Sequence, residues 1–177
     1  FELQQAANRR LAIVIPITLV IVILILCGLF NSLRLALFIV LNIPLALVGG
    51  VFGLFIFGEN VSIPSSIGFI ALFGIALTDG LVLINKFELL RDRSKSIIDV
   101  TIHGCRSKFR PVLMTTLTTV LGLVPLILST GTGSEIQRPL AIVVVFGLIT
   151  STVVTLFVMP TIYCLVENRW PRSPVNQ

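Results

Sequence analysis

Five long apolar runs dominate this chain of 177 residues. A helix rises 1.5 Å per residue, so about 20 apolar residues cross the roughly 30 Å hydrocarbon core of a bilayer. Runs of this length cover residues 11–30, 35–57, 63–85, 111–130 and 139–166. We therefore predict an all-α fold, an integral membrane bundle of five transmembrane helices in which the whole of 11–166 is the membrane unit.

The composition excludes an ordinary soluble domain. Hydrophobic residues make up 55% of the chain, charged residues make up 12%, and the mean hydropathy is +1.05. So little polar material cannot cover a water-exposed globule. The net charge of +5 raises the question of nucleic acid, but the basic residues are distributed by membrane side, which favours a role in topology and no nucleic-acid partner.

The basic residues also predict an orientation. Ten Lys and Arg flank one side of the predicted spans and three flank the other, out of 13 in the chain. Because Lys and Arg accumulate in cytoplasmic loops, the N-terminus is expected outside and the C-terminus in the cytoplasm. Residues 1–10 then belong to the end of an external domain, 88–110 to a cytoplasmic amphipathic segment, and 167–177 to a cytoplasmic tail.

Two local signals predict where helices begin. Pro111 suits the first turn of the fourth span, where its missing N–H costs little. Ser134 and Gln137 have the spacing of a capping box, which places the start of the last helix at Ser134. The glycines of residues 131–133 lack the following Lys that a phosphate-binding loop requires.

Asp79 is the only formally charged residue within the five spans. It lies about eight residues from the cytoplasmic end of its helix, hence roughly 12 Å deep. Placing Asp at a bilayer centre costs about 2.5–3.5 kcal/mol, so the residue needs a partner, a water-filled cavity or a function. We predict a carboxyl that takes up and releases protons; the alternative is a neutral, hydrogen-bonded carboxyl that joins helices.

Hydroxyl side chains on the last three spans form a candidate polar seam that points toward Asp79. Its members are Thr78, Thr115, Thr116, Thr118, Thr119, Thr150, Ser151 and Thr152. Such residues also act as ordinary contacts between membrane helices. Asn42 and Pro44 predict a kink in the second span, and the glycines that follow predict close helix packing; we assign them no chemistry.

The potential metal ligands do not form a recognisable site. Cys27, Cys105 and Cys164 are widely spaced and are interpreted as packing residues. His103 has only Asp99 at helical spacing, which is more typical of a solvated surface pair than of a metal site. No Ser/His pair, paired Asp or HExxH pattern supports a membrane-embedded hydrolase. The residues alone thus favour a proton- or ion-coupled transporter, an inert membrane module being the alternative.

Three segments carry a family resemblance. They read "GFIALFGIALTDGLVLINKF", "RSKFRPVLMTTLTTVLGLVPLIL" and "GTGSEIQRPLAIVVVFGLITSTVVTLFVMPTIY". Together they closely resemble the final helices of resistance-nodulation-division (RND) efflux pumps, and the third is similar to the heavy-metal branch, the CzcA/CusA-like inner-membrane pumps. The resemblance runs through about residues 3–166, and the chain looks like the last five helices of the twelve-helix RND membrane domain.

The resemblance implies a secondary active transporter, a proton/substrate antiporter that exports heavy-metal cations, and no enzyme or cofactor. It also implies a homotrimer in the bacterial inner membrane, with a periplasmic N-terminus here, and partners that include the rest of the protomer, a periplasmic adaptor and an outer-membrane channel. A multidrug-type RND pump is the nearest alternative; a truncated module without transport of its own is another.

Residue by residue, the resemblance supports three candidates for a proton relay: Asp79, Thr78 and Thr115. Thr115 matches a relay threonine of the multidrug branch. Thr78 stands where related pumps carry Lys, Glu or an apolar residue, and Asp79 stands where most carry Asn. The resemblance assigns no metal ligand to this chain: Met114 and Met159 are membrane residues.

Overall fold

The computed structural model describes residues 16–18, 20–29, 33–91, 97–131 and 133–169. These residues form helices and short turns, and no strand occurs among them. The main elements are α2 (Leu33–Phe57), α3 (Ile63–Arg91), α4 (Ile97–Leu128), α5 (Ser134–Val153), a π-helix (Val154–Val158) and α6 (Met159–Arg169). The predicted all-α membrane bundle is confirmed.

Four helical stretches of the described chain are long and apolar enough to cross a membrane. They cover Leu35–Phe57, Ile63–Leu90, Ile97–Leu128 and Ser134–Val166. Of the predicted span 11–30, residues 11–15, 19 and 30 lie outside the described part, and the remainder belongs to a shorter apolar helix, Pro16–Leu29. The count of five spans stays a prediction.

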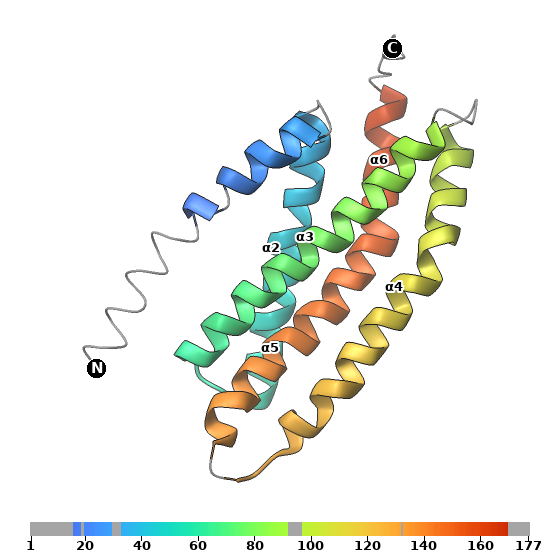
Figure 1. The fold of residues 1–177 in the computed structure, drawn as a ribbon. Coiled ribbons are helices and arrows are strands. Elements are labelled where there is room, and N and C mark those ends of the chain that lie inside the picture. The colour runs from blue at the N-terminus through green and yellow to red at the C-terminus, as the bar shows by residue number, and fades with distance from the viewer. Residues whose placement is uncertain (1–15, 19, 30–32, 92–96, 132, 170–177) are drawn as a thin grey trace.

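Helix α5 forms the centre of the bundle because it packs against α2, α3 and α4. In Figure 1, α4 runs along one side of the bundle and the N-terminal helical segment lies on the opposite side. In the stretch Ser134–Val166, which contains α5, 61% of the most apolar 18-residue segment is buried. In α4 the corresponding share is only 11%. Most of α4 therefore presents its side chains to the surroundings of this chain.

Glycines on α2 allow this helix to lie close against α5. A Cβ atom on Gly49 would overlap the Thr150 side chain of α5 and lie 3.0 Å from the Phe146 carbonyl oxygen. A Cβ on Gly53 would lie 2.7 Å from the Phe146 Cβ. Only residues without a side chain permit two helix backbones to approach this closely, as the sequence predicted.

Helix α4 differs from the expected local pattern at Pro111. The proline lies in the interior of a helix that runs without interruption from Ile97 to Leu128, so the position predicted for it in a first turn is wrong. Pro111 removes one backbone hydrogen bond, which the surrounding turns tolerate because the adjacent bonds persist. Of the predicted amphipathic segment 88–110, residues 97–110 therefore share one helix with the fourth span, residues 88–91 belong to α3, and residues 92–96 lie outside the described part.

Helix α5 begins at Ser134, as predicted, but without the capping box expected from Ser134 and Gln137. Gly133 is the N-cap, with φ of 98°, and no side chain caps the helix. Its carbonyl oxygen accepts hydrogen bonds from the N–H groups of Ile136 at 3.2 Å and Gln137 at 3.4 Å. A left-handed φ favours glycine over Ser at the cap, so the capping-box prediction is wrong.

Candidate functional site

Asp79 lies half-buried on α3, between two residues that pack tightly against other helices. Ala76 is fully buried. At Gly80, a Cβ atom would lie 3.3 Å from Ile39 Cγ2 on α2 and 3.6 Å from Met159 Cε on α6. The backbone around Asp79 is thus held by both neighbouring helices. Within the described part of the chain, no hydrogen bond or ion pair reaches the Asp79 carboxyl.

The two threonines predicted to accompany Asp79 bond to their own helices. The Thr78 hydroxyl donates to the Gly74 carbonyl at 2.9 Å, and the Thr115 hydroxyl lies 2.9 Å from the Val112 carbonyl. Both side chains are exposed on this chain. Thr78 borders a small apolar hollow shared with Leu26 and Leu81, and Thr115 lies on α4. No hydrogen bond among the described residues joins the three candidates.

Asn42, to which the sequence reasoning assigned no chemistry, makes a fully buried polar contact between helices. Its side chain is fully buried in α2. The amide nitrogen Nδ2 donates to the Ala76 carbonyl of α3 at 3.0 Å and to Thr155 Oγ1 at 3.0 Å, and lies 3.4 Å from Ser151 Oγ. One amide therefore connects three helical stretches, one turn away from Asp79.

Part of the predicted hydroxyl seam is present, but it joins helices and does not lead to Asp79. Thr116 on α4 and Thr152 on α5 share a hydrogen bond of 2.8 Å, and both are buried. Thr150 bonds to its own helix through the Phe146 carbonyl at 3.0 Å. The polar layer therefore crosses α2, α4 and α5, where it adds directional contacts to an otherwise apolar interior.

The Asn42 contact coincides with a break in helical register. Residues Val154–Val158 form a π-helix between α5 and α6, and Thr155 is one of them. Pro160 follows at the start of α6 and lacks the N–H that would bond the carbonyl of Leu156. A sequence signal existed: a lone amide inside an apolar span usually has an interhelical partner.

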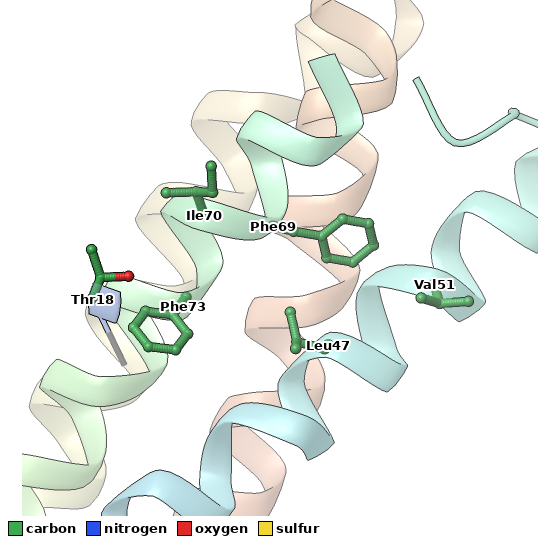
Figure 2. Close-up of a pocket in the computed structure, with 6 residues that line it drawn as sticks. All are labelled: Thr18, Leu47, Val51, Phe69, Ile70 and Phe73. Atoms are coloured by element: carbon green, nitrogen blue, oxygen red, sulfur yellow. The ribbon is translucent and has the colours of Figure 1, made fainter. Parts of the chain in front are cut away.

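A surface cavity of about 310 Å³ lies between the N-terminal helical segment, α2 and α3. Figure 2 shows its lining: five apolar side chains and one hydroxyl, from Thr18, Leu47, Val51, Phe69, Ile70 and Phe73. Since none of these side chains ionises near neutral pH, the cavity offers no group for proton transfer. Its apolar walls suit hydrocarbon.

The described residues contain no group of three or more His, Cys, Asp or Glu side chains that could hold a metal ion together. Asp99 and His103 are both exposed on the first turns of α4.

Comparison with known proteins gives the family. The family model of the AcrB/AcrD/AcrF proteins matches residues 1–167. The chain belongs to the AcrB/AcrD/AcrF family. Protein HelA of Legionella pneumophila is 48% identical over 170 residues, covering 96% of this chain and 16% of its own length. The cobalt-zinc-cadmium resistance protein CzcA of Cupriavidus metallidurans is 42% identical over 182 residues, covering 100% of this chain and 17% of its own length.

A solved structure agrees with the sequence relatives. The crystal structure of a heavy metal efflux pump, crystal form II, is similar with a TM-score of 0.84 and 41% identity, over 96% of this chain and 16% of that one. The chain thus spans about one sixth of the length of the relatives it matches. The predicted likeness to CzcA/CusA-like RND pumps is confirmed, and with it a multi-pass membrane protein of a transporter family.

Proposed function

We propose that this chain is part of the proton-translocating membrane domain of a pump that exports heavy-metal cations in exchange for protons. The observation that carries the proposal is the 42–48% identity, across almost the whole chain, to proteins that include a cobalt-zinc-cadmium resistance protein. A multidrug substrate is the weaker alternative, since the similar solved structure is that of a heavy metal efflux pump.

Asp79 is the residue of this chain that we assign to the proton path. An ionised carboxylate in hydrocarbon is costly, and no described residue hydrogen-bonds it. Its partner is therefore water or a helix of the complete protomer. The half-buried side chain is held on a backbone packed between Ile39 and Met159, which gives the carboxyl a defined position from which to exchange a proton.

We also assign Thr78 and Thr115 to the surroundings of that path. Each hydroxyl donates to a carbonyl of its own helix and keeps its oxygen lone pairs free to accept a hydrogen bond. Both side chains are exposed on this chain. A hydroxyl can take part in proton transfer only where it faces water or polar groups of another helix, and not where it faces lipid. The rest of the protomer is expected to cover them.

The orientation that we propose puts the α2–α3 turn outside and the α3–α4 connection in the cytoplasm of a bacterial inner membrane. Arg138, a basic residue on the outer side, lies 3.5 Å from Glu59 of the α2–α3 turn, measured from Nε to Oε1. The partners that follow from this function are a second and third copy of the pump, a periplasmic adaptor, and an outer-membrane channel.

Substitution of Asp79 in the complete pump tests the assignment. We expect Asp79→Ala to reduce the metal tolerance of cells to that of cells without the pump, at unchanged expression. Asp79→Asn separates the two roles: lost tolerance indicates a titrating carboxyl, and retained tolerance indicates a neutral hydrogen-bonding group. Asp99→Asn is the matched control, because Asp99 is exposed at the start of α4. Full tolerance in both Asp79 variants removes Asp79 from the mechanism.

The transported substrate is tested separately. Everted membrane vesicles that contain the complete pump should take up Zn²⁺, Co²⁺ or Cd²⁺ when a proton gradient is imposed, and uptake should stop when the gradient is collapsed. Uptake of hydrophobic drugs without any metal uptake would favour the multidrug alternative. No response to either substrate class in a folded, trimeric pump would contradict the proposed function.

A further inference from the structure

Asn42 lies in the middle of a buried seam on α2. The buried positions of this seam alternate in steps of four and three residues: Leu35, Ile39, Asn42, Ala46, Gly49 and Gly53. Asn42 is the polar member of the set. Apolar seams between membrane helices leave sliding and rotation weakly determined, because lipid tails are as apolar as the side chains that they replace. A single buried Asn in such a seam fixes the register of the helices around it.

Helix α3 decides the orientation of the Asn42 amide. Nδ2 lies 3.0 Å from the Ala76 carbonyl oxygen, which can only accept a hydrogen bond. The reversed amide would place Oδ1 against this oxygen, and two acceptors would repel each other. Nδ2 also has Thr155 Oγ1 of the π-helix at 3.0 Å and Ser151 Oγ of α5 at 3.4 Å. Since hydroxyl oxygens can face either end of an amide, the contact with α3 is the one that requires the nitrogen.

The oxygen of the same amide has no partner in the described part of the chain. Oδ1 is buried and no described group donates a hydrogen bond to it. An unpaired buried acceptor is destabilising, so Oδ1 offsets part of the stability that the Nδ2 contacts contribute. A residue that served only to join helices would be expected to have both polar atoms paired. The amide provides direction more than stability.

The carbonyl that Asn42 contacts is one helical turn from Asp79. Ala76 precedes Asp79 by three residues, so the carboxyl is about 4.5 Å further along α3 and about 60° around the helix. Gly80 follows Asp79, and a Cβ atom on Gly80 would lie 3.3 Å from Ile39 Cγ2. Ile39 is one turn before Asn42 on the same face of α2. Two adjacent positions of α2 thus hold α3 on both sides of Asp79.

We infer that Asn42 is a positioning residue for Asp79, because its amide fixes the rotation and height of α3 at the turn that carries the carboxyl. The inference rests on the proposed function, in which Asp79 exchanges a proton. Proton transfer requires a donor and an acceptor within hydrogen-bond reach. A misplacement of about 1 Å is enough to cost on the order of 100-fold in rate. Loss of Asn42 should therefore affect transport far more than it affects the fold.

Transport by the complete pump in liposomes tests this role, with Zn²⁺ as the ion and an imposed proton gradient. We expect Asn42→Leu to lower kcat at least tenfold and to leave the KM for Zn²⁺ within twofold, because the change acts on the proton step and not on metal binding. Thr152→Val is the matched control. It removes another buried interhelical hydrogen bond, of 2.8 Å, to Thr116 of α4, and should keep kcat within twofold. Equal losses in both variants, or no loss in Asn42→Leu, would overturn the inference.

A second measurement follows the register of α2 and α3 and requires no transport. A Cβ atom on Gly80 would lie 3.7 Å from Ile39 Cα, near enough for a disulfide between thiols introduced by Ile39→Cys and Gly80→Cys. Mass spectrometry of the oxidised complete pump should find this disulfide. Adding Asn42→Leu should slow its formation more than fivefold, and adding Thr152→Val should change the rate less than twofold.

The two measurements separate the inference from the proposed function. Absence of the disulfide, or an unchanged rate of its formation with Asn42→Leu, would overturn the positioning role whatever the pump transports. A wild-type pump that moves no Zn²⁺ but shows the expected change in disulfide formation would contradict the proposed function, and it would support the hold of Asn42 on α3.

Discussion

Replacement of Gly49 by Ala tests the close approach of α2 and α5. The added methyl group would overlap the Thr150 side chain and stand 3.0 Å from the Phe146 carbonyl oxygen. Neither obstacle is the flexible end of a long side chain, so the two helices must move apart to admit the methyl. Gly122→Ala on α4 is the matched control, because nothing lies within 4 Å of the Cβ that it adds.

The magnitude follows from two opposing terms. Overpacking a tight contact costs typically about 1–3 kcal/mol, and replacing Gly by Ala inside a helix gains roughly 0.5–1 kcal/mol. Gly122→Ala should show only this gain in stability, because its added methyl group meets no neighbour. Since that gain is common to both variants, the difference between them is the overpacking term, about 1–3 kcal/mol. A cost of 1 kcal/mol shifts the unfolding midpoint by roughly 2–4 °C in a protein of 150–250 residues and by less in a larger one, so in the complete pump the two midpoints should differ by at most about 12 °C.

The assay is heat-induced exposure of buried cysteines to a fluorogenic maleimide in the complete pump. The reporter groups in this segment are Cys27, Cys105 and Cys164, which are half-buried and free. Gly49→Ala should unfold at the lower temperature. Adding Thr150→Gly to it should recover part of the loss, because that change removes the overlapping atoms but places a glycine inside α5 at a cost of roughly 0.5–1 kcal/mol. Equal midpoints for Gly49→Ala and Gly122→Ala would refute the close α2–α5 contact.

Three further predictions use the same assay. Thr116→Val and Thr152→Val each remove the 2.8 Å hydrogen bond between α4 and α5. A double-mutant cycle of the two should give a coupling energy of about 0.6 kcal/mol, and at most about 1.7 kcal/mol. Zero coupling energy would mean that the bond contributes nothing to stability. Tyr163→Phe keeps the ring contact with Phe87, at 4.8 Å between centroids, but loses the 3.2 Å hydrogen bond to Glu88 Oε1 on α3. It should lower the free energy of unfolding by about 1 kcal/mol, and an unchanged free energy of unfolding would contradict that bond. Arg138→Gln removes a partly exposed ion pair with side chains 37% and 28% accessible, so the loss should stay below about 1 kcal/mol and disappear in 1 M NaCl; a loss that persists in high salt would show that Arg138 acts by packing.

The helices themselves could be predicted because the solvent leaves the chain few choices. In hydrocarbon each backbone hydrogen bond has to be made within the span, so an apolar run of sufficient length is helical whatever lies beside it. The expected runs 35–57 and 63–85 agree with α2 (Leu33–Phe57) and the apolar part of α3 (Ile63–Arg91). The polar last turns of α3, beyond residue 85, were missed because hydropathy predicts only the part of a helix that lies in the membrane, and a helix can continue past it into water.

The candidate site was predictable only as a set of residues. Asp79 stands out because a charge in an apolar span is rare and costly, and the placement of this carboxyl on α3 required no structure. Only the structure shows which polar groups near Asp79 make contacts between helices. Thr78 and Thr115 bond to their own helices, while Asn42, to which no chemistry had been assigned, makes the interhelical contact. A hydroxyl that can bond its own backbone carries no information about its neighbours.

The sequence by itself determined that this is a helical membrane protein, where most of its helices run, and which family it belongs to, since these depend on local hydropathy and on the order of residues. Only the tertiary structure decided that Asn42 reaches Ala76 and Thr155, that α4 continues through Pro111, and that the Cys164 thiol donates to the Thr101 hydroxyl of α4. Those contacts depend on how separate helices rotate and tilt against one another. That arrangement is set by the summed packing of all of them, and no single stretch of sequence contains it.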